Sequence, residues 1–210
     1  MASSLTTDIW KGGGEPPGSG DFGGGSGGRG ASRRASLTGL MVLLAAVVMF
    51  FAALTSAFIV RRGLSSDWEH TQMPRMLFLS TAVLLGSSAA LELARRALKA
   101  GHRERFNRLW TAGSVLGILF LAGQYAAWLQ LRAQGIYLST NPSSSFFYVL
   151  TAAHAVHLIG GVLALLYVSI QALRLRLGPG KRTAIDVTAM YWHFLDGLWI
   201  YLLILFLVWG

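Results

Sequence analysis

The stretch LTGLMVLLAAVVMFFAALTSAFIV, Leu37–Val60, contains 24 residues and no charged side chain. About 20 apolar residues are enough to cross the hydrocarbon core of a bilayer as an α-helix, so the stretch predicts a membrane-spanning helix. Arg33 and Arg34, before it, loosely resemble a twin-arginine export signal. Because the apolar run is too long for a signal peptide, we interpret the arginines as positive charge flanking a membrane span.

Four further segments have the length and apolar character of membrane spans. They are residues 74–93, 109–131, 145–173 and 187–209. Hydrophobic residues make up 53% of the chain and charged residues 13%, with a mean hydropathy of +0.51, which excludes an ordinary soluble domain. We therefore predict an all-α integral membrane protein, a bundle of five transmembrane helices formed by residues 37–210.

Residues 1–36 differ from the rest of the chain in composition. They contain eleven glycines, the pair Pro16 and Pro17, and almost no large apolar side chains. A segment of this kind cannot bury enough surface to offset its ordering entropy, so we expect a disordered tail rich in Gly, Ser and Pro.

Lysine and arginine are distributed unevenly between alternate loops. The tail and the loops 94–108 and 174–186 together carry fourteen, whereas the loops 61–75 and 132–144 carry four. Positive charge favours the cytoplasmic side, so we expect the N-terminus inside and the C-terminus outside. The net charge of +9 therefore indicates membrane topology, and the basic loops lack the aromatic residues typical of a nucleic-acid interface.

Small residues in the predicted spans indicate close helix packing. Gly113 and Gly117 form a G-x-x-x-G pair, residues 86–90 form a small-residue segment, and Gly160 is followed by Gly161. Such residues allow two helix backbones to approach closely. They are consistent with a dimer motif, or with helix packing inside one bundle or against a partner subunit, and we favour the packing.

Ionisable side chains inside the spans are the candidate functional residues, because a charge at mid-membrane costs roughly 2.5 to 3.5 kcal/mol even on the lenient insertion scale. His154 and His157 share one helix face, and His193 and Asp196 share another. Helix geometry allows Asp196 to reach the depth of His157 or His154. A metal site, a proton relay, and a structural hydrogen-bond network that clamps two helices or holds a lipid headgroup all fit, and the network is favoured.

Glu92 is the acidic residue of the second span, near its end. Arg95 and Arg96 follow it at helical spacing, so we expect an interfacial ion pair with a structural role. Cysteine is absent, which excludes disulfides, thiolate metal sites, a dinuclear copper centre and C-x-x-C-H haem attachment.

Four segments, in order along the chain, resemble subunit III of the haem-copper oxidases, the cytochrome c oxidase subunit III family. Residues 191–199, YWHFLDGLW, are similar to its Y-W-H-F-V-D-x-x-W signature, and residues 145–161 to its paired-histidine segment F-F-x-L-T-G-x-H-G-x-H-V-x-x-G. Residues 123–128 are similar to G-Q-x-x-x-W and residues 49–53 to M-F-F-A-A. The resemblance covers residues 37–210 and implies the short, five-helix bacterial form.

The resemblance implies an accessory subunit in the bacterial plasma membrane. Members pack beside catalytic subunit I, with subunit II in the same complex, hold structural phospholipid, and support proton uptake and resistance to turnover inactivation. Haem and copper belong to the partner subunits, so no catalytic residue and no cofactor are expected here. A lipid site or polar clamp would be formed by six residues: His154, His157, His193, Asp196, Trp192 and Trp199.

The chain departs from the family pattern at Val47, which stands where S-E-V-M-F-F has a buried glutamate. Any role of that carboxylate is absent, which favours lipid binding and assembly over proton collection. The electron donor stays open, because quinol oxidases and nitric oxide reductases have similar subunits. A stand-alone proton or ion carrier is the alternative of a different class.

Overall fold

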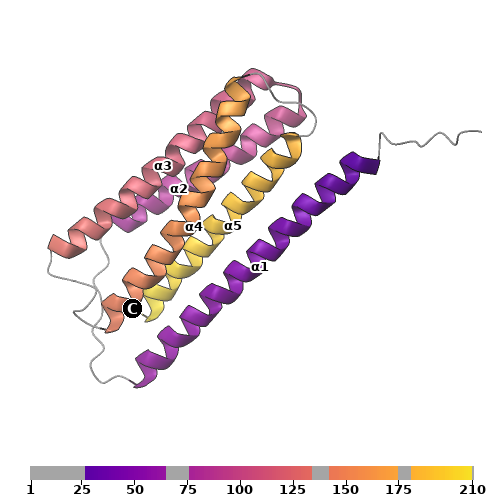
Figure 1. Cartoon of the computed structure of the whole chain (residues 1–210). Helices are drawn as coiled ribbons and strands as arrows, with labels where there is room; N and C mark the ends of the chain where they lie inside the picture. The colour runs from indigo at the N-terminus through magenta and orange to yellow at the C-terminus, as the bar shows by residue number, and fades with distance from the viewer. Residues whose placement is uncertain (1–26, 65–75, 134–141, 175–180, 210) are drawn as a thin grey trace, which may run out of the picture.

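The computed structural model describes residues 27–64, 76–133, 142–174 and 181–209, and in these ranges the chain forms five long α-helices and no strand (Figure 1). All five are long and apolar enough to cross a membrane, which confirms the predicted all-α membrane fold. The helices are α1 (Gly27–Leu64), α2 (Met76–Lys99), α3 (Arg103–Ala133), α4 (Pro142–Leu173) and α5 (Lys181–Trp209).

The helices extend beyond the uncharged runs at most of their ends. α1 begins at Gly27, ten residues before the predicted start at Leu37, and α5 begins at Lys181 instead of Val187. At the ends where arginine, lysine or glutamate flanks the apolar run, as at Lys99 and Arg103, the backbone stays helical because these residues are good helix formers. The predicted tail of residues 1–36 therefore overlaps the first turns of α1, and its first 26 residues lie outside the described part of the chain.

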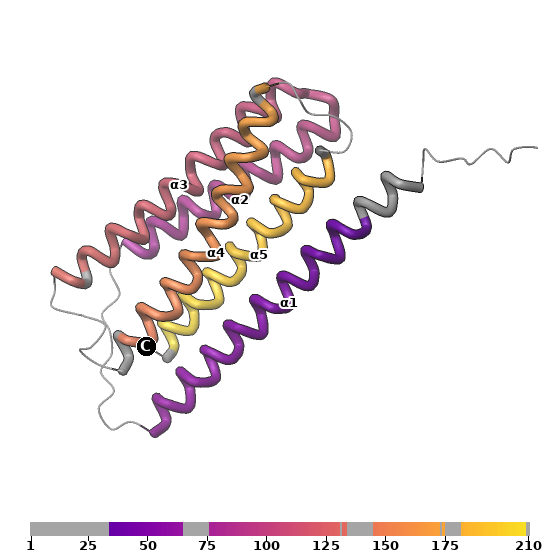
Figure 2. Tube along the Cα trace, in the orientation of Figure 1, coloured from indigo at the N-terminus to yellow at the C-terminus, as the bar shows by residue number. Residues whose placement is uncertain are grey.

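Helices α2, α3, α4 and α5 form a closed ring, in which each helix packs against two neighbours. α1 lies outside this ring, along one side of it (Figure 1), and among the five helices it contacts α4 and α5 only. The colour gradient of Figure 2 shows that successive helices run in opposite directions. The protein is thus an antiparallel four-helix bundle with a fifth helix along one side.

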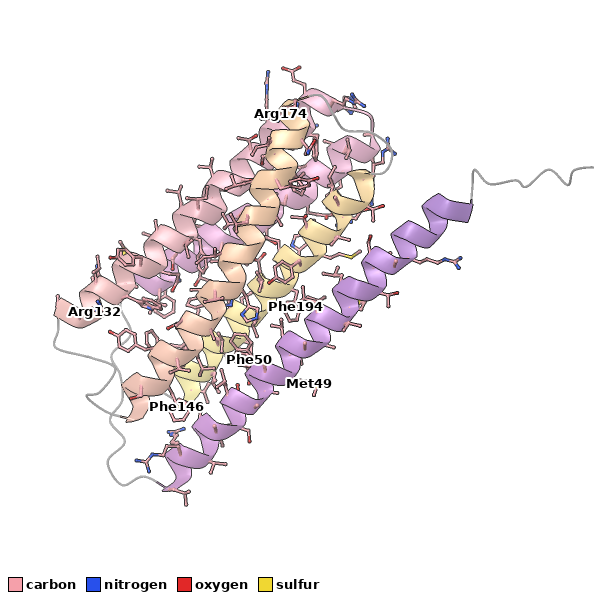
Figure 3. All side chains as sticks on the ribbon, viewed as in Figure 1. Met49, Phe50, Arg132, Phe146, Arg174 and Phe194 are labelled. Atoms are coloured by element: carbon pink, nitrogen blue, oxygen red, sulfur yellow. The ribbon has the colours of Figure 1, made fainter. Side chains whose placement is uncertain are left out.

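The ends of successive described helices alternate between the two ends of the bundle. Figure 3 places Arg132, at the end of α3, and Arg174, after α4, at the two ends. This arrangement is the one that the lysine and arginine distribution requires, because loops on one side of a membrane must share an end. Which end faces the cytoplasm stays a prediction.

The connection between α2 and α3 is a tight turn. Gly101 has a φ of +84°, a left-handed conformation that glycine adopts without strain. The Gly101 amide donates to the Leu98 carbonyl at 3.1 Å and the His102 amide to the Ala97 carbonyl at 3.0 Å, the pattern of a Schellman cap. The cap ends α2 and lets α3 return directly along it, and these two helices form the closest pair in the bundle.

Candidate functional site

The indole of Trp192, on α5, fills the axis of the four-helix ring and is fully buried. A Cβ atom added at Gly117 of α3 would lie 2.7 Å from the indole, and one at Gly161 of α4 would lie 3.2 Å from it. The two glycines therefore form a slot that admits the ring. The small residues of the sequence thus pack helices within one bundle.

Two turns along α5, Trp199 occupies the same axis and is also fully buried. Its Nε1 donates to the Thr81 hydroxyl of α2 at 3.0 Å, and its ring meets Phe120 of α3 edge-on, with centroids 5.4 Å apart. His154 of α4 lies against the other side, with ring centroids 5.3 Å apart. One tryptophan thus joins α2, α3 and α4 to α5.

Asp196 lies between the two tryptophans on the inward stripe of α5 and is only 4% exposed. Its Oδ2 is 3.9 Å from Nδ1 of His193, one turn back on the same helix. That nitrogen shares a hydrogen bond of 2.5 Å with the Ser88 hydroxyl of α2. Within the described residues, neither carboxylate oxygen of Asp196 meets a hydrogen-bond partner. The buried carboxylate is therefore held near polar groups without being bonded to them.

The paired histidines of α4 separate into different surroundings. His154 is buried against Trp199, and neither ring nitrogen has a hydrogen-bond partner among the described residues. The His157 ring faces α1 and lies 5.7 Å from the Phe51 ring, centroid to centroid. Its Nδ1 is 2.7 Å from the Ala153 carbonyl oxygen, and the Tyr191 hydroxyl donates to the backbone carbonyl of His157 at 3.2 Å.

The bridge that helix geometry allowed between Asp196 and His157 or His154 is therefore not formed. Equal depth brings residues to the same level, but the rotation of each helix decides which face they present. Asp196 sits on the side of α5 towards α2, whereas His157 faces α1. The four polar residues thus lie in three local environments, and only His193 and Asp196 come together.

A second polar cluster joins α2 and α5 nearer one end of the bundle. Arg95 places Nη1 3.0 Å from Glu92 Oε2 and Nη2 3.0 Å from Asp186 Oδ1 of α5. Arg96 Nε lies 3.1 Å from Glu92 Oε1. The Arg95 side chain is 16% exposed, so this pair is largely shielded from solvent, and it ties the two helices together.

The cytochrome c oxidase subunit III family model matches residues 30–210, which is nearly the whole described chain. The chain belongs to this family. A probable cytochrome c oxidase subunit 3 of Nocardia farcinica is 32% identical over 146 residues, which cover 68% of this chain and 72% of that protein. The cytochrome c oxidase subunit 3 of Thermostichus vulcanus is 30% identical over 157 residues, 71% of this chain and 75% of that protein. That of Corynebacterium diphtheriae is 30% identical over 135 residues, with coverages of 64% and 65%.

Membership of the subunit III family confirms the resemblance read from the motifs. With the five spans, it identifies a multi-pass bacterial membrane protein of the aerobic respiratory chain, one subunit of an oxidase complex. The described residues contain no group of three or more His, Asp or Glu side chains placed to hold a metal ion. The histidines separated by the fold thus offer no metal site there.

Val47, where the subunit III pattern has a glutamate, is buried at 3% exposure in the hydrophobic core. It lies one turn before Phe51, on the face of α1 that packs towards His157. Figure 3 shows Met49 on the opposite side of α1 from Phe50, and Met49 is 73% exposed. The apolar substitution is therefore part of the packing between α1 and the ring.

Sequence reasoning missed three partners of the predicted site residues: Ser88, which bonds to His193, Thr81, which bonds to Trp199, and Asp186, which pairs with Arg95. Ser88 and Thr81 are hydroxyl residues on a helix that looked merely small and apolar. Asp186 was assigned to a loop, although its position seven residues before His193 puts it on the same face of α5. Extending the helical period past the uncharged run is the signal that would have found it.

Proposed function

We propose that this chain is the non-catalytic accessory subunit III of a bacterial haem-copper terminal oxidase, which stabilises catalytic subunit I in a complex with subunit II. The supporting observation is that the polar residues inside the membrane spans pack between the helices of this chain and join them. Trp192, Trp199 and His154 pack along the bundle axis, and the Arg95 cluster joins two helices. These groups hold a rigid bundle together, which suits a subunit that buttresses a neighbour in the membrane.

Structural phospholipid is the second part of the proposal. An apolar groove of about 430 Å³ runs between α3 and α4, with Ile118 and Tyr125 on one wall and Ala155 and Ile159 on the other. Its size and apolar lining suit an acyl chain. We expect Ala155→Trp, which fills the groove, to reduce the phospholipid that copurifies with the oxidase. Val156→Trp, at an exposed neighbour outside the groove, is the matched control.

The experiment that tests the function is affinity purification of the tagged chain from native membranes, read by a haem absorption spectrum. Copurification of haem at a fixed ratio supports the accessory subunit. A copper-binding second subunit in the same preparation indicates a cytochrome c oxidase, and its absence indicates a quinol oxidase or a nitric oxide reductase. Haem-free chain that dissipates a proton gradient in liposomes would instead establish a stand-alone proton or ion carrier.

Support of proton uptake is the third part of the proposal. The departure at Val47 removes one buried acid, so any such support must use other groups of this chain. The fold brings ionisable residues together between α2 and α5, within the four-helix ring, and not on α1, where Val47 lies.

A further inference from the structure

The polar residues between α2 and α5 form two clusters, together called the α2–α5 seam, an outer one near one end of the bundle and an inner one in its interior. On α2 the members are Ser88, Glu92 and Arg95, about one turn apart, and on α5 they are Asp186, His193 and Asp196. The outer rungs are the Arg95 contacts to Glu92 and Asp186. The inner rung is the hydrogen bond between Ser88 and His193.

His193 connects the two halves of the seam. Its side chain is 33% exposed, and it lies within electrostatic range of the Glu92 carboxylate, one turn from Ser88 on α2. On the inner side, its Nδ1 is 3.9 Å from the Asp196 carboxylate, a gap that a small movement of either side chain closes. A neutral imidazole has one ring nitrogen that accepts a proton and one that donates a proton, so it can pass a proton in either direction.

The seam ends at a group that the protein leaves without a bonded partner. Both Asp196 oxygens are buried and meet no donor among the described residues. Across the axis from α5, α4 presents His154, whose ring packs on Trp199, and α3 presents Gly117 and Phe120. An ionised carboxylate without donors is costly in such surroundings, and a bound proton is the ligand that removes the cost.

We propose that Asp196 is a proton-binding site reached through the α2–α5 seam. A proton enters from water at the Arg95 end, is taken up by His193, whose Nδ1 is hydrogen-bonded to the Ser88 hydroxyl, and passes across the 3.9 Å gap to the Asp196 carboxylate, which becomes the acid; release reverses the path. Among the described residues Asp196 has no hydrogen-bond partner to which a proton could pass on, so the site stores one proton and does not conduct it further. This inference rests on the proposed support of proton uptake and assigns it to a named group.

The test is infrared spectroscopy of the assembled oxidase during transfer from H₂O to D₂O. We expect a carbonyl band of a protonated carboxylic acid that shifts on deuteration, disappears in Asp196→Asn and moves in Asp196→Glu. Should Asp196→Asn fail to assemble, the Glu variant still assigns the band. Absence of any band sensitive to these substitutions would overturn the proposal.

Two substitutions of one residue test the path. Ser88→Val removes the hydroxyl and puts two methyl groups on Cβ. Ser88→Thr has almost the same shape as the valine variant but keeps the hydroxyl. We expect deuterium to reach Asp196 about tenfold more slowly in the Val variant, and at close to the native rate in the Thr variant. Equal exchange in both variants would show that protons do not pass this rung. Haem copurification is measured in the same samples, so a failed subunit assignment is distinguished from a failed proton site.

Discussion

At the scale of single residues, the bundle axis depends on the absence of two side chains. Gly117 and Gly161 leave the room that the Trp192 indole occupies, and Asp196 is enclosed one turn further along α5. Because an indole is rigid and is held on both sides, it cannot move aside when a neighbour grows. The glycines are therefore required by packing in the membrane, where close contact replaces the hydrophobic effect as the force between helices.

We predict that Gly117→Ala destabilises the subunit. The new methyl group would lie 2.7 Å from the indole of Trp192. Overpacking costs about 1–3 kcal/mol, and contact with a rigid, enclosed indole favours the upper part of this range, above the roughly 1 kcal/mol that alanine gains over glycine in a helix. The midpoint of thermal denaturation in detergent should fall. Gly86→Ala is the control, because its nearest contact would be an ordinary 3.8 Å, and its midpoint should not fall.

We expect Asp196→Ala to lower the assembly of the oxidase, or its durability during turnover, more than its initial rate. Removing the side chain opens a cavity beside Trp192 and Trp199 and deprives His193 of its acidic neighbour. The measurements are subunit stoichiometry after purification and the decay of oxygen consumption with time. A complex that assembles normally yet loses most of its first-turnover activity would instead show that Asp196 delivers protons during turnover and does not merely store one.

Restoring the acid at position 47 should create a pair with His157. Val47 is buried on the face of α1 that packs towards that imidazole. Val47→Glu is therefore expected to reduce the free energy of unfolding less in the native protein than in the His157→Phe variant. A double-mutant cycle measures this coupling. Val48→Glu, on a more exposed face, should show no coupling to His157. Equal losses in both backgrounds would show that the two positions do not meet.

At the scale of helices, charge ties α2 to α5 where small and aromatic residues tie the others. We predict that Asp186→Asn lowers the free energy of unfolding by about 1.5–3 kcal/mol, the range for hydrogen bonds to charged groups, because Arg95 is left with one acidic partner in a shielded site. Glu104→Gln is the control. Its partner Arg108 is highly exposed, so the loss of the Glu104–Arg108 ion pair should lower the free energy of unfolding much less.

At the scale of the whole molecule, the topology can be tested cleanly because the chain contains no cysteine. We expect His102→Cys, in the α2–α3 turn, to be protected in intact cells from a thiol reagent that cannot cross the membrane, and Leu64→Cys, at the end of α1, to react. The expectation follows from fourteen basic residues on one side against four. The reverse pattern of labelling would place the N-terminus outside.

The sequence by itself determined the number of spans, their order and the family. Uncharged length is set by bilayer thickness, a constraint that acts on each helix alone, so Leu37–Val60 could be interpreted without its neighbours. The same local rule paired Glu92 with Arg95 and Arg96, since a helical turn fixes which side chains meet. Uncharged length misplaced the helix ends, because a charged residue ends the apolar run while the backbone remains helical.

The tertiary structure alone decided which polar groups of different helices meet. Spacing put His154 with His157 and His193 with Asp196, but the rotation of α4 and α5 about their axes turned the first pair towards Trp199 and α1 and the second towards α2. That rotation is set by the fit of Trp192 between Gly117 and Gly161, contacts between helices far apart in sequence. No local periodicity encodes such a fit, because it depends on three helices at once.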